Sequence, residues 1–435
     1  MDSIMKEIQV GLLGLGTVGS GVVRIITDHQ ERLIHQVGCP VKVTKVLVQN
    51  IEKEREVEVP STLLTQDAHE ILDNPNIDVV IEVMGGIDDA KAYILQALQS
   101  GKHVVTANKD LMALHGAELL AVAKDNKADL FYEASVAGGI PILRSIVEGL
   151  SSDLITKVMG IVNGTTNFIL TKMSDEGRAY NDVLKEAQQL GFAEADPTSD
   201  VEGLDAARKM TILATLGFST NVELGDVKVK GITSITEEDI EYSKSLGYTI
   251  KLIGLAKRDG EKLEVTVEPT LLPNTHPLAA VQNEYNAVYV YGEAVGETMF
   301  YGPGAGSLPT ATAVVSDLVA VMQNIRLGVN GNSAVSPQYK KVLKEPDEIV
   351  VKKFLRLHVK DEIGVFAKIT SLFSERGVSF EKIIQMPLEE KGKAEIVIVT
   401  HRASLADYDY ILHTLQGYEE IDCVKANYRI EGDAK

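Results

Sequence analysis

Residues 7–19 read Glu7-Ile8-Gln9-Val10-Gly11-Leu12-Leu13-Gly14-Leu15-Gly16-Thr17-Val18-Gly19 and decide the fold of the first third of the chain. An apolar run ending at Leu13 predicts a buried strand, and a GxGxxG pattern follows it directly and opens a helical pattern. Gly14 permits the tight turn, Gly16 lets the backbone approach a pyrophosphate, and Gly19 lets the helix sit close to the sheet. The free N–H groups and positive end of that helix favour a phosphate. The stretch therefore predicts a dinucleotide-binding loop rather than a glycine turn without a ligand.

Outward from this loop, short apolar strands alternate with helical patterns. Strands are expected at 41–48, 77–83, 103–106 and 128–132, and helices at 18–37 and 88–100. Such alternation predicts βαβ units and an α/β fold with a Rossmann-type, doubly wound parallel sheet. We therefore expect residues 1–140 to form a dinucleotide-binding domain, to which a long apolar return helix within 307–330 packs back.

The rest of the chain changes character twice. Residues 141–306 mix helical and strand patterns and predict a central α+β domain for substrate binding, catalysis and dimerisation. Residues 331–351, with prolines and a charged cluster, indicate a linker. Residues 352–435 predict the order βαββαβ, which is ferredoxin-like. Because this tail has its own alternating core, we expect it to be a separable domain.

Composition bounds the class of protein. The chain has 435 residues, 45% hydrophobic and 24% charged, so two or three globular domains are expected. A net charge of −19 argues against a nucleic-acid partner. Cys39 and Cys423 form no CxxC pair, which fits a reducing compartment and gives no zinc motif. Met1–Lys6 lacks the apolar core of a signal peptide, and no stretch approaches the uninterrupted apolar length of a membrane helix. We expect a cytoplasmic protein without a membrane partner.

The tip of the second expected strand bears on the choice of cofactor. An acid at this position would hold the ribose diol of NAD, but the strand ends Val48-Gln49-Asn50, with Lys53 and Arg55 just beyond. The lack of a carboxylate weakens the repulsion of a 2′-phosphate, so NADP is permitted beside NAD. The alternative, that Asn50 is only a turn residue, stays open.

Two lysines and a group of carboxylates are the candidates for chemistry. Lys109 follows the fourth expected strand, where ligands of open α/β sheets lie; an ordinary surface lysine is the alternative. Asp205 and Lys209 lie four residues apart on an expected helix and share a face, with Glu194 and Asp200 nearby in sequence. In a cleft, such a lysine can exchange a proton with a substrate alcohol or carbonyl, and the acids can hold an ammonium group. Outside a cleft, Asp205 and Lys209 form a plain surface pair.

Four stretches, in one order, resemble the homoserine dehydrogenase family. They are GLGTVG at 14–19, TANKD at 106–110, GIVNGTTNFIL at 160–170 and GLDAARK at 203–209. The resemblance covers roughly residues 6–330, and the combination is specific where no single stretch is. It implies the interconversion of L-homoserine and L-aspartate 4-semialdehyde with NAD or NADP, in threonine and methionine biosynthesis. We expect a homodimer or a homotetramer.

The resemblance also implies roles for single residues. Lys209 resembles the acid/base residue and Lys109 its partner near nicotinamide and substrate, with Asp205 beside them. Glu194 resembles the ligand of the substrate ammonium group, and the implied substrate set is Glu194, Asp200, Asp205 and Thr165. The implied cofactor contacts are Gly14, Gly16, Thr17, Val18, Gly19, Lys109 and Gly306.

Two loops take their implied roles from the resemblance. Gly302-Pro303-Gly304-Ala305-Gly306 resembles the loop that closes near the nicotinamide, and it is also a tight helix-entry turn. Glu133, with the backbone carbonyls of Val136, Gly138 and Ile140, resembles a site for a monovalent cation, Na⁺. The residues alone predict only a loop of small side chains there.

Residues 352–430 resemble an ACT domain. Asp361-Glu362-Ile363-Gly364-Val365-Phe366 is similar to its first turn, D-x-P-G-V-F/L, with Ile363 where proline is common. ACT modules often bind amino acids at paired interfaces, so the resemblance implies threonine as an effector near this turn. A purely structural or dimerising tail is the alternative.

Two other functions fit parts of the pattern. Aspartate-semialdehyde dehydrogenase needs a cysteine nucleophile, and neither Cys39 nor Cys423 is placed as one. A non-catalytic sensor of a dinucleotide and an amino acid would leave Lys209 and its neighbouring carboxylates without a purpose.

Overall fold

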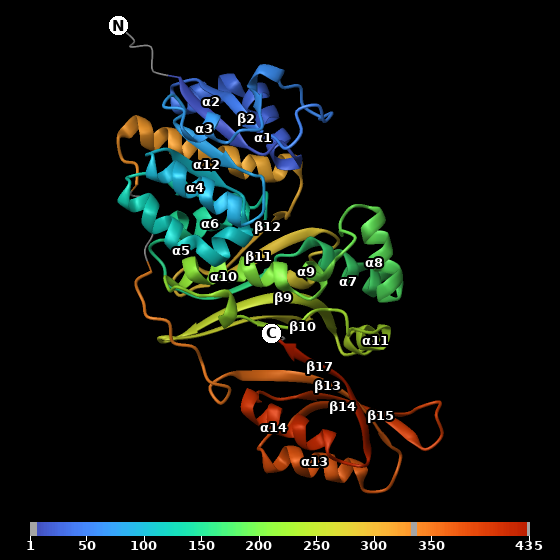
Figure 1. The fold of residues 1–435 in the computed structure, drawn as a ribbon. Coiled ribbons are helices and arrows are strands. Elements are labelled where there is room, and N and C mark those ends of the chain that lie inside the picture. Colours follow the sequence, from blue (N-terminus) through green and yellow to red (C-terminus); the bar gives the residue numbers. More distant parts are fainter. Residues whose placement is uncertain (1–6, 332–336, 433–435) are drawn as a thin grey trace. The chain divides into compact units, whose positions relative to one another are not determined.

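The computed structural model describes residues 7–331 and 337–432. The expectations for Met1–Lys6 and for positions 332–336 of the predicted linker lie outside these residues. The chain divides into two compact units (Figure 1), which are described separately. The first holds residues 1–156, 208–225 and 286–340, and the second holds residues 157–207, 226–285 and 341–435. The boundaries of the functional domains stay a prediction.

A six-stranded sheet lies at the centre of the first unit, in the order β3-β2-β1-β4-β5-β6. Its strands are β3 (Leu64–Thr65), β2 (Val41–Leu47), β1 (Ile8–Leu13), β4 (Val79–Glu82), β5 (His103–Thr106) and β6 (Leu130–Phe131). All of the neighbouring pairs are parallel. The order reverses between β1 and β4, which is the Rossmann arrangement, and ligands bind beyond the carboxyl ends of strands at such a switch point. The predicted doubly wound parallel sheet is confirmed.

The first unit contains the helices α1 (Thr17–Asp28), α2 (Gln30–Val37), α3 (His69–Leu72), α4 (Asp88–Gln99), α5 (Lys109–Asp125), α6 (Ile142–Arg144) and α12 (Ser307–Leu327). The single helix expected over 18–37 is wrong, because the backbone at His29 (φ −110°, ψ 20°) leaves the helical conformation and separates α1 from α2. The hairpin β11 (Tyr285–Gly292) and β12 (Gly296–Pro303) precedes α12.

The return helix α12 packs against α1, as the sequence predicts. A Cβ added to Gly21 would lie 2.9 Å from the Cβ of Ala311, so the two helices approach with almost no side chain between them. The buried apolar side chains of α12 share one core with β1 and α1. This helix is long and apolar enough to cross a membrane, which the sequence analysis did not expect. Half of that stretch is buried inside the protein, as in the core helix of a folded domain.

The second unit is built on a sheet in the order β7-β9-β10-β17-β13-β15-β14. These strands are β7 (Ile155–Ile161), β9 (Tyr248–Asp259), β10 (Lys262–Pro273), β17 (Ile421–Ile430), β13 (Val350–Lys360), β15 (Lys393–Thr400) and β14 (Phe380–Pro387). Two short strands pair beside it, β8 (Lys228–Val229) with β10 and β16 (Ala403–Ser404) with β13. Its helices are α7 (Gly164–Glu176), α8 (Tyr180–Gln189), α9 (Thr198–Val201), α11 (Glu237–Ser245), α13 (Val365–Glu375) and α14 (Leu405–Gln416). Helix α10 (Leu204–Phe218) begins in this unit, and its residues from Arg208 belong to the first.

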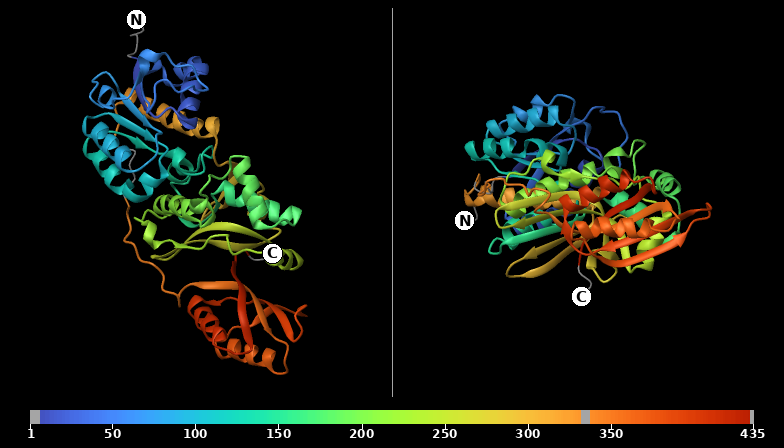
Figure 2. Two further views of the ribbon diagram at one scale, coloured as in Figure 1. Left: turned by 45° about the vertical axis from the view of Figure 1, so that its right-hand side comes forward. Right: turned by 90° about the horizontal axis from the view of Figure 1, so that it is seen from below.

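The tail has the predicted order βαββαβ, and α13 and α14 cover one face of its sheet (Figure 2). The pairing order β17-β13-β15-β14 is ferredoxin-like and confirms that prediction. One pairing was not expected: β17 also joins β10 in parallel, with Thr270 opposite Arg429 and Leu271 opposite Ile430. The tail sheet is therefore continuous with the sheet of β9 and β10.

Candidate active site

The glycine loop of the first unit has the geometry of a phosphate-binding turn. Gly14 adopts φ +104°, and a Cβ there would lie 2.9 Å from the backbone of Met84. A Cβ on Gly19 would lie 2.2 Å from the carbonyl oxygen of Gly14, so only glycine lets α1 start this close to β1. Around Gly16 no atom of the described chain lies within 4 Å of such a Cβ. Gly16 is the N-cap residue of α1, and no side chain caps the first N–H groups of the helix. These N–H groups therefore face open space that suits a pyrophosphate.

Two further loops of the first unit reach this region. The Ser307 hydroxyl donates to the carbonyl of Thr17 at 2.7 Å, which holds the start of α12, capped by Gly306, beside the phosphate loop. The backbone N–H of Gly139 donates to the carbonyl of Pro303 at 3.1 Å. A Cβ on Gly138 would lie 2.5 Å from the Gly304 oxygen. The structure thus brings together loops that the resemblance assigns separately to the nicotinamide and to a cation.

A buried polar network, which the sequence analysis missed, braces the ends of β4 and β5. The carboxylate of Glu82 accepts the Thr106 hydroxyl at 2.6 Å and the N–H groups of Met84 and Gly85 at 2.9 and 3.1 Å. Burial raises the pKa of Glu82, and the hydrogen bond from Thr106 opposes that shift. The signal in the sequence was an acid at the end of an otherwise apolar strand.

Asn108 and Arg208 are the sequence neighbours of the two candidate lysines, and both make contacts at the start of α5. Asn108 caps α5 by accepting the N–H of Leu111 at 3.1 Å, so Lys109 is the first residue of that helix. The guanidinium of Arg208 lies 2.7 Å from the carboxylate of Asp110. This ion pair joins the start of α5 to α10 and brings the neighbourhoods of Lys109 and Lys209 together. Sequence reasoning placed both lysines by motif but did not find the ion pair beside them.

The second unit gathers the candidate carboxylates around Asn163. Its side-chain amide donates to Asp200 at 2.7 Å and to Asp205 at 2.9 Å, while its oxygen caps α7 by accepting the N–H of Thr166 at 2.8 Å. Asp205 is buried and Asp200 half-buried, and the two acids share one amide. Sequence reasoning missed Asn163, although the run Asn163-Gly164-Thr165-Thr166 has the form of a helix cap.

The other two predicted substrate residues are Thr165 and Glu194, and their hydrogen bonds are made with residues other than Asp200 and Asp205. The hydroxyl of Thr165 is buried and donates to the carbonyl of Phe192 at 2.5 Å, which ties α7 to the loop after α8. Glu194 is exposed on that loop, and its backbone carbonyl accepts Gln188 at 3.1 Å. The side chain of Glu194 therefore faces solvent and can meet a ligand from there.

Glu133, the predicted cation ligand, is buried and makes several hydrogen bonds within the first unit. Its two carboxylate oxygens accept the N–H groups of Leu143 and Arg144 at 2.8 and 2.7 Å and so cap the start of α6. Its backbone N–H donates to Asp317, which also accepts Arg144 at 2.7 Å. Burial raises the pKa of Glu133 and raises the pKa of Asp317 to about 7. The carbonyl of Ile140 accepts the N–H of Ile142 at 2.8 Å.

The tip of β2 carries a guanidinium instead of an acid. The side chain of Arg55 folds back and donates to the carbonyls of Asn50, Ile51 and Lys53. The side-chain oxygen of Asn50 accepts the N–H of Glu52 at 2.9 Å, so Asn50 is a turn residue as well. The two interpretations of Asn50 are thus compatible.

Comparison with known proteins matches three stretches of the chain to family models. Residues 14–133 match the family model described as "Homoserine dehydrogenase, NAD binding domain", residues 141–319 match "Homoserine dehydrogenase", and residues 353–412 match "ACT domain". The homoserine dehydrogenase of Bacillus subtilis (strain 168) is 68% identical over 430 residues, which is 99% of both chains. A crystal structure of a homoserine dehydrogenase from Thiobacillus denitrificans is 38% identical, covers 98% of both chains and has a TM-score of 0.92. That of Staphylococcus aureus at pH 7.5 is 40% identical, covers 99% of this chain and 100% of its own, and has a TM-score of 0.78.

A Rossmann sheet with a glycine-rich phosphate loop and a match to an NAD-binding family model define an NAD(P)-dependent oxidoreductase, which here also carries an ACT domain. Over its whole length, the chain belongs to the homoserine dehydrogenase family. The recognition, fold, function and enzyme class that the sequence predicts are confirmed. The relatives are named homoserine dehydrogenases. They therefore support neither of the two alternative functions, the aspartate-semialdehyde dehydrogenase and the non-catalytic sensor.

Proposed function

We propose that the chain interconverts L-homoserine and L-aspartate 4-semialdehyde through Lys209 as the acid/base residue. In the direction of oxidation, the C4–H bond of homoserine breaks with its electron pair, the C4–O bond becomes a carbonyl, and the hydroxyl proton passes to the Lys209 amine. The nicotinamide of NAD(P), when bound, accepts the hydride. In reduction, the Lys209 ammonium returns the proton to the carbonyl oxygen. The observation that carries this proposal is the ion pair of Arg208 and Asp110 beside both lysines.

The carboxylates supply recognition of the amino acid part of the substrate. The buried pair Asp200 and Asp205, held by Asn163, suits polar groups of the substrate, and the exposed carboxylate of Glu194 suits its ammonium group. On this account Lys109 lies near the nicotinamide and the reacting oxygen. Loss of Glu194 should raise KM for homoserine more than it lowers kcat, because the ammonium contact is made equally in the ground and transition states.

Substitution of Lys209 tests the acid/base role. Lys209→Ala should lower kcat by about 10²–10⁴-fold, with little change in cofactor affinity, because proton transfer by a positioned group is worth that much. Lys185→Ala, at an exposed lysine of α8, is the matched control and should leave kcat unchanged. If Lys209→Ala turns over at nearly the wild-type rate, Lys209 has no part in the chemistry.

For the cofactor, we propose that NADP is used at least as well as NAD. Arg55 and Lys53 stand at the tip of β2 where a carboxylate would repel a 2′-phosphate. Asn50→Asp should move the ratio of kcat/KM toward NAD, and Arg55→Met should lower kcat/KM for NADP alone. A wild-type enzyme that strongly prefers NAD would contradict this proposal.

The monovalent cation is also a proposal. Each oxygen of Glu133 accepts one N–H and keeps a lone pair, so the carboxylate can accept a cation besides capping α6. The carbonyls of Val136, Gly138 and Ile140 would complete the set. At constant ionic strength, replacing Na⁺ by tetramethylammonium should lower Tm and kcat of the wild type and leave Glu133→Gln insensitive. Equal values in both salts would remove the cation from the account.

For the tail, we propose a cytoplasmic homodimer or homotetramer whose ACT modules pair and bind threonine near residues 361–366. In that turn Gly364 adopts φ +97°, Ile363 is fully exposed and Phe366 is partly exposed, which leaves apolar surface for pairing. Ile363→Glu should weaken threonine inhibition while kcat without threonine stays unchanged. If the wild type ignores threonine over a wide range, the tail is structural or senses another molecule.

A further inference from the structure

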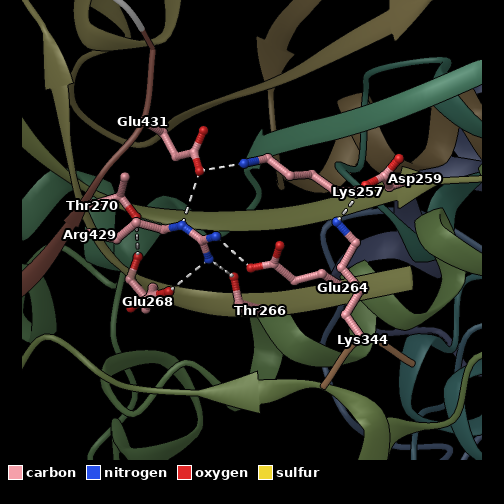
Figure 3. Close-up of polar contacts among 9 residues, drawn as sticks. All are labelled: Lys257, Asp259, Glu264, Thr266, Glu268, Thr270, Lys344, Arg429 and Glu431. Atoms are coloured by element: carbon pink, nitrogen blue, oxygen red, sulfur yellow. Dashed lines mark hydrogen bonds and ion pairs between the residues drawn. The ribbon is translucent and has the colours of Figure 1, made fainter. Parts of the chain in front are cut away.

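The junction of β10 and β17 contains a dense cluster of buried charges (Figure 3). Arg429 is 2% exposed and donates to Glu431 at 3.0 Å, to Glu268 at 3.2 Å and to Glu264. Lys257, from β9, donates to the same oxygen of Glu431 at 2.6 Å. Every carboxylate of this cluster therefore has a cationic partner, and the cluster joins the tail to the sheet of β9 and β10.

Lys353 differs from these residues because its ammonium makes no hydrogen bond or ion pair within the described part of the chain. It lies directly opposite Arg429 in the register of β13 and β17, so the two cations point to the same face of the sheet. Lys353 is 5% exposed. Burial lowers the pKa of Lys353, Glu268 opposes that shift, and the like charges of Arg429 and Lys230 add to it. An ammonium on a side chain this buried is costly when no ion pair or hydrogen bond holds it, which favours a further counter-charge beside Glu268.

The side chain of Lys353 lines a small cavity in this junction. The cavity has a volume of about 130 Å³, which corresponds to about four water molecules in the liquid. Its lining includes the cations Lys230, Lys353 and Arg429, the carboxylates of Glu264 and Glu268, and the apolar side chains of Ile349, Val351 and Leu405. Lys230 is held there by its bond to the carbonyl of Asn427 at 2.9 Å. Four cations (Lys228, Lys230, Lys353 and Arg429) and two carboxylates (Glu264 and Glu268) line the cavity, so its charged lining carries an excess of two positive charges.

We infer that this cavity binds a small carboxylate, whose charge pairs with Lys353 and Lys230 and whose short apolar end packs on Val351 and Leu405. The cavity admits only a few non-hydrogen atoms, so the ligand is of the size of propionate. The site lies at the start of β13. The turn at residues 361–366, which follows this strand and is called the ACT turn below, is roughly 25 Å away along the chain. It is therefore distinct from the proposed threonine site. Because the cavity sits where β17 joins β10, occupancy would stabilise the attachment of the tail.

Calorimetric titration of the full-length protein with sodium propionate, at constant ionic strength, tests this inference. The wild type should bind saturably and with a stoichiometry of one per chain, and its Tm should rise by a few degrees as the site fills. Lys353→Met should lose both effects, yet be as stable as the wild type or more so without propionate, because an apolar side chain replaces an unpaired buried charge. Lys360→Met, at a more exposed position of the same strand, should behave like the wild type.

A second variant keeps the test decisive if Lys353→Met does not fold. Leu405→Trp fills the cavity from the start of α14 and keeps every charge, and it should also lose propionate binding. Sodium chloride and sodium sulfate serve as controls for anions in general. Equal binding of chloride or sulfate, undiminished binding in Lys353→Met, or no binding to the wild type would each overturn the inference.

Discussion

At the scale of single residues, substitution of Arg208 should affect the positioning of the candidate lysines much more than it affects the stability of the protein. Its ion pair with Asp110 is partly exposed, with side chains 24% and 37% accessible, so its loss should cost at most about 1 kcal/mol of unfolding free energy. Arg208→Gln should nevertheless lower kcat about 10- to 100-fold, because small displacements of catalytic groups are expensive. Steady-state kinetics and urea unfolding measure the two effects. Lys368→Met, which breaks a comparable ion pair with Glu420, is the control and should not change kcat. An unchanged kcat in Arg208→Gln would show that the ion pair positions neither lysine.

Lys251 should give the protein a pH-dependent stability. Burial lowers its pKa to about 8, and its ammonium donates to Asn167 at 3.0 Å and to the carbonyl of Val281 at 2.6 Å. Asp175 is the charged group that opposes the shift. Because the folded-state pKa lies below the unfolded one, the unfolded chain binds more protons between pH 8 and 10.5, so stability rises with pH in that window.

The measurement compares urea unfolding of the wild type and of Lys251→Met from pH 7 to 10. The difference in unfolding free energy should change in favour of the wild type as pH rises above 8, by up to roughly 3 kcal/mol. Other groups titrate in this range, and the comparison with the variant cancels them. A difference that stays constant with pH would mean that Lys251 keeps an ordinary pKa.

A candidate site residue could be predicted from the sequence when its signal lay within one short stretch of the chain. The motifs predicted Lys109, Lys209 and Asp205, since each lies in a short characteristic stretch. Asn163 was missed because its bonds to Asp200 and Asp205 span 37 and 42 residues and exist only after folding. The pairing of Arg208 with Asp110 depends on the packing of two helices, which neither stretch encodes alone.

Among the elements, the phosphate loop offers the sharpest steric test. Gly19→Ala places a Cβ 2.2 Å from the carbonyl oxygen of Gly14, so α1 must move away from β1. We expect a loss of about 1–3 kcal/mol in stability and at least about a tenfold rise in the Kd of the cofactor. Gly225→Ala, where no atom of the described chain lies within 4 Å, is the matched control. Cofactor binding by Gly19→Ala at wild-type affinity would contradict the proposed role of the loop.

The elements were predictable where periodicity is uninterrupted. The βαββαβ order of the tail and the parallel strands of the Rossmann sheet followed from alternating apolar runs. Strand β9 was missed because Lys251 and Lys257 interrupt its apolar pattern, and only the tertiary partners of these lysines make their burial tolerable. The break at His29 has no glycine or proline to signal it. The pairing of β17 with β10 joins segments about 160 residues apart, which no local pattern reports.

At the scale of the whole molecule, the pairing of β17 with β10 makes the tail part of a larger sheet. Removal of the tail should therefore also affect the stability of the rest of the chain. Removal of the chain after Glu348 takes away Arg356 and Arg429 and leaves Asp239, Glu264 and Glu268 without these cations. Breaking buried ion pairs in this way costs about 3–5 kcal/mol each, and the edge of β10 becomes exposed. The truncated chain should therefore melt at a lower temperature and aggregate, rather than behave as the separable-tail expectation requires.

The melting temperature and the soluble fraction of the truncated chain measure this effect. Adding Glu264→Gln and Glu268→Gln to the truncated chain should restore part of the stability, because neutral side chains cost less to leave unpaired. A truncated chain that is as stable and soluble as the wild type would show that the tail is separable after all. Single substitutions in the ACT turn are thus the better probe of threonine control.

The central claim, that this chain moves a hydride from C4 of L-homoserine to a nicotinamide, is tested most directly with L-homoserine carrying two deuterium atoms at C4. The purified protein is incubated with this substrate and NADP⁺ or NAD⁺, and the reduced cofactor is analysed by mass spectrometry. The account predicts that each reduced cofactor carries one deuterium and that the semialdehyde keeps the other. Reduced cofactor without deuterium, or no reduction of either cofactor by homoserine, would contradict it.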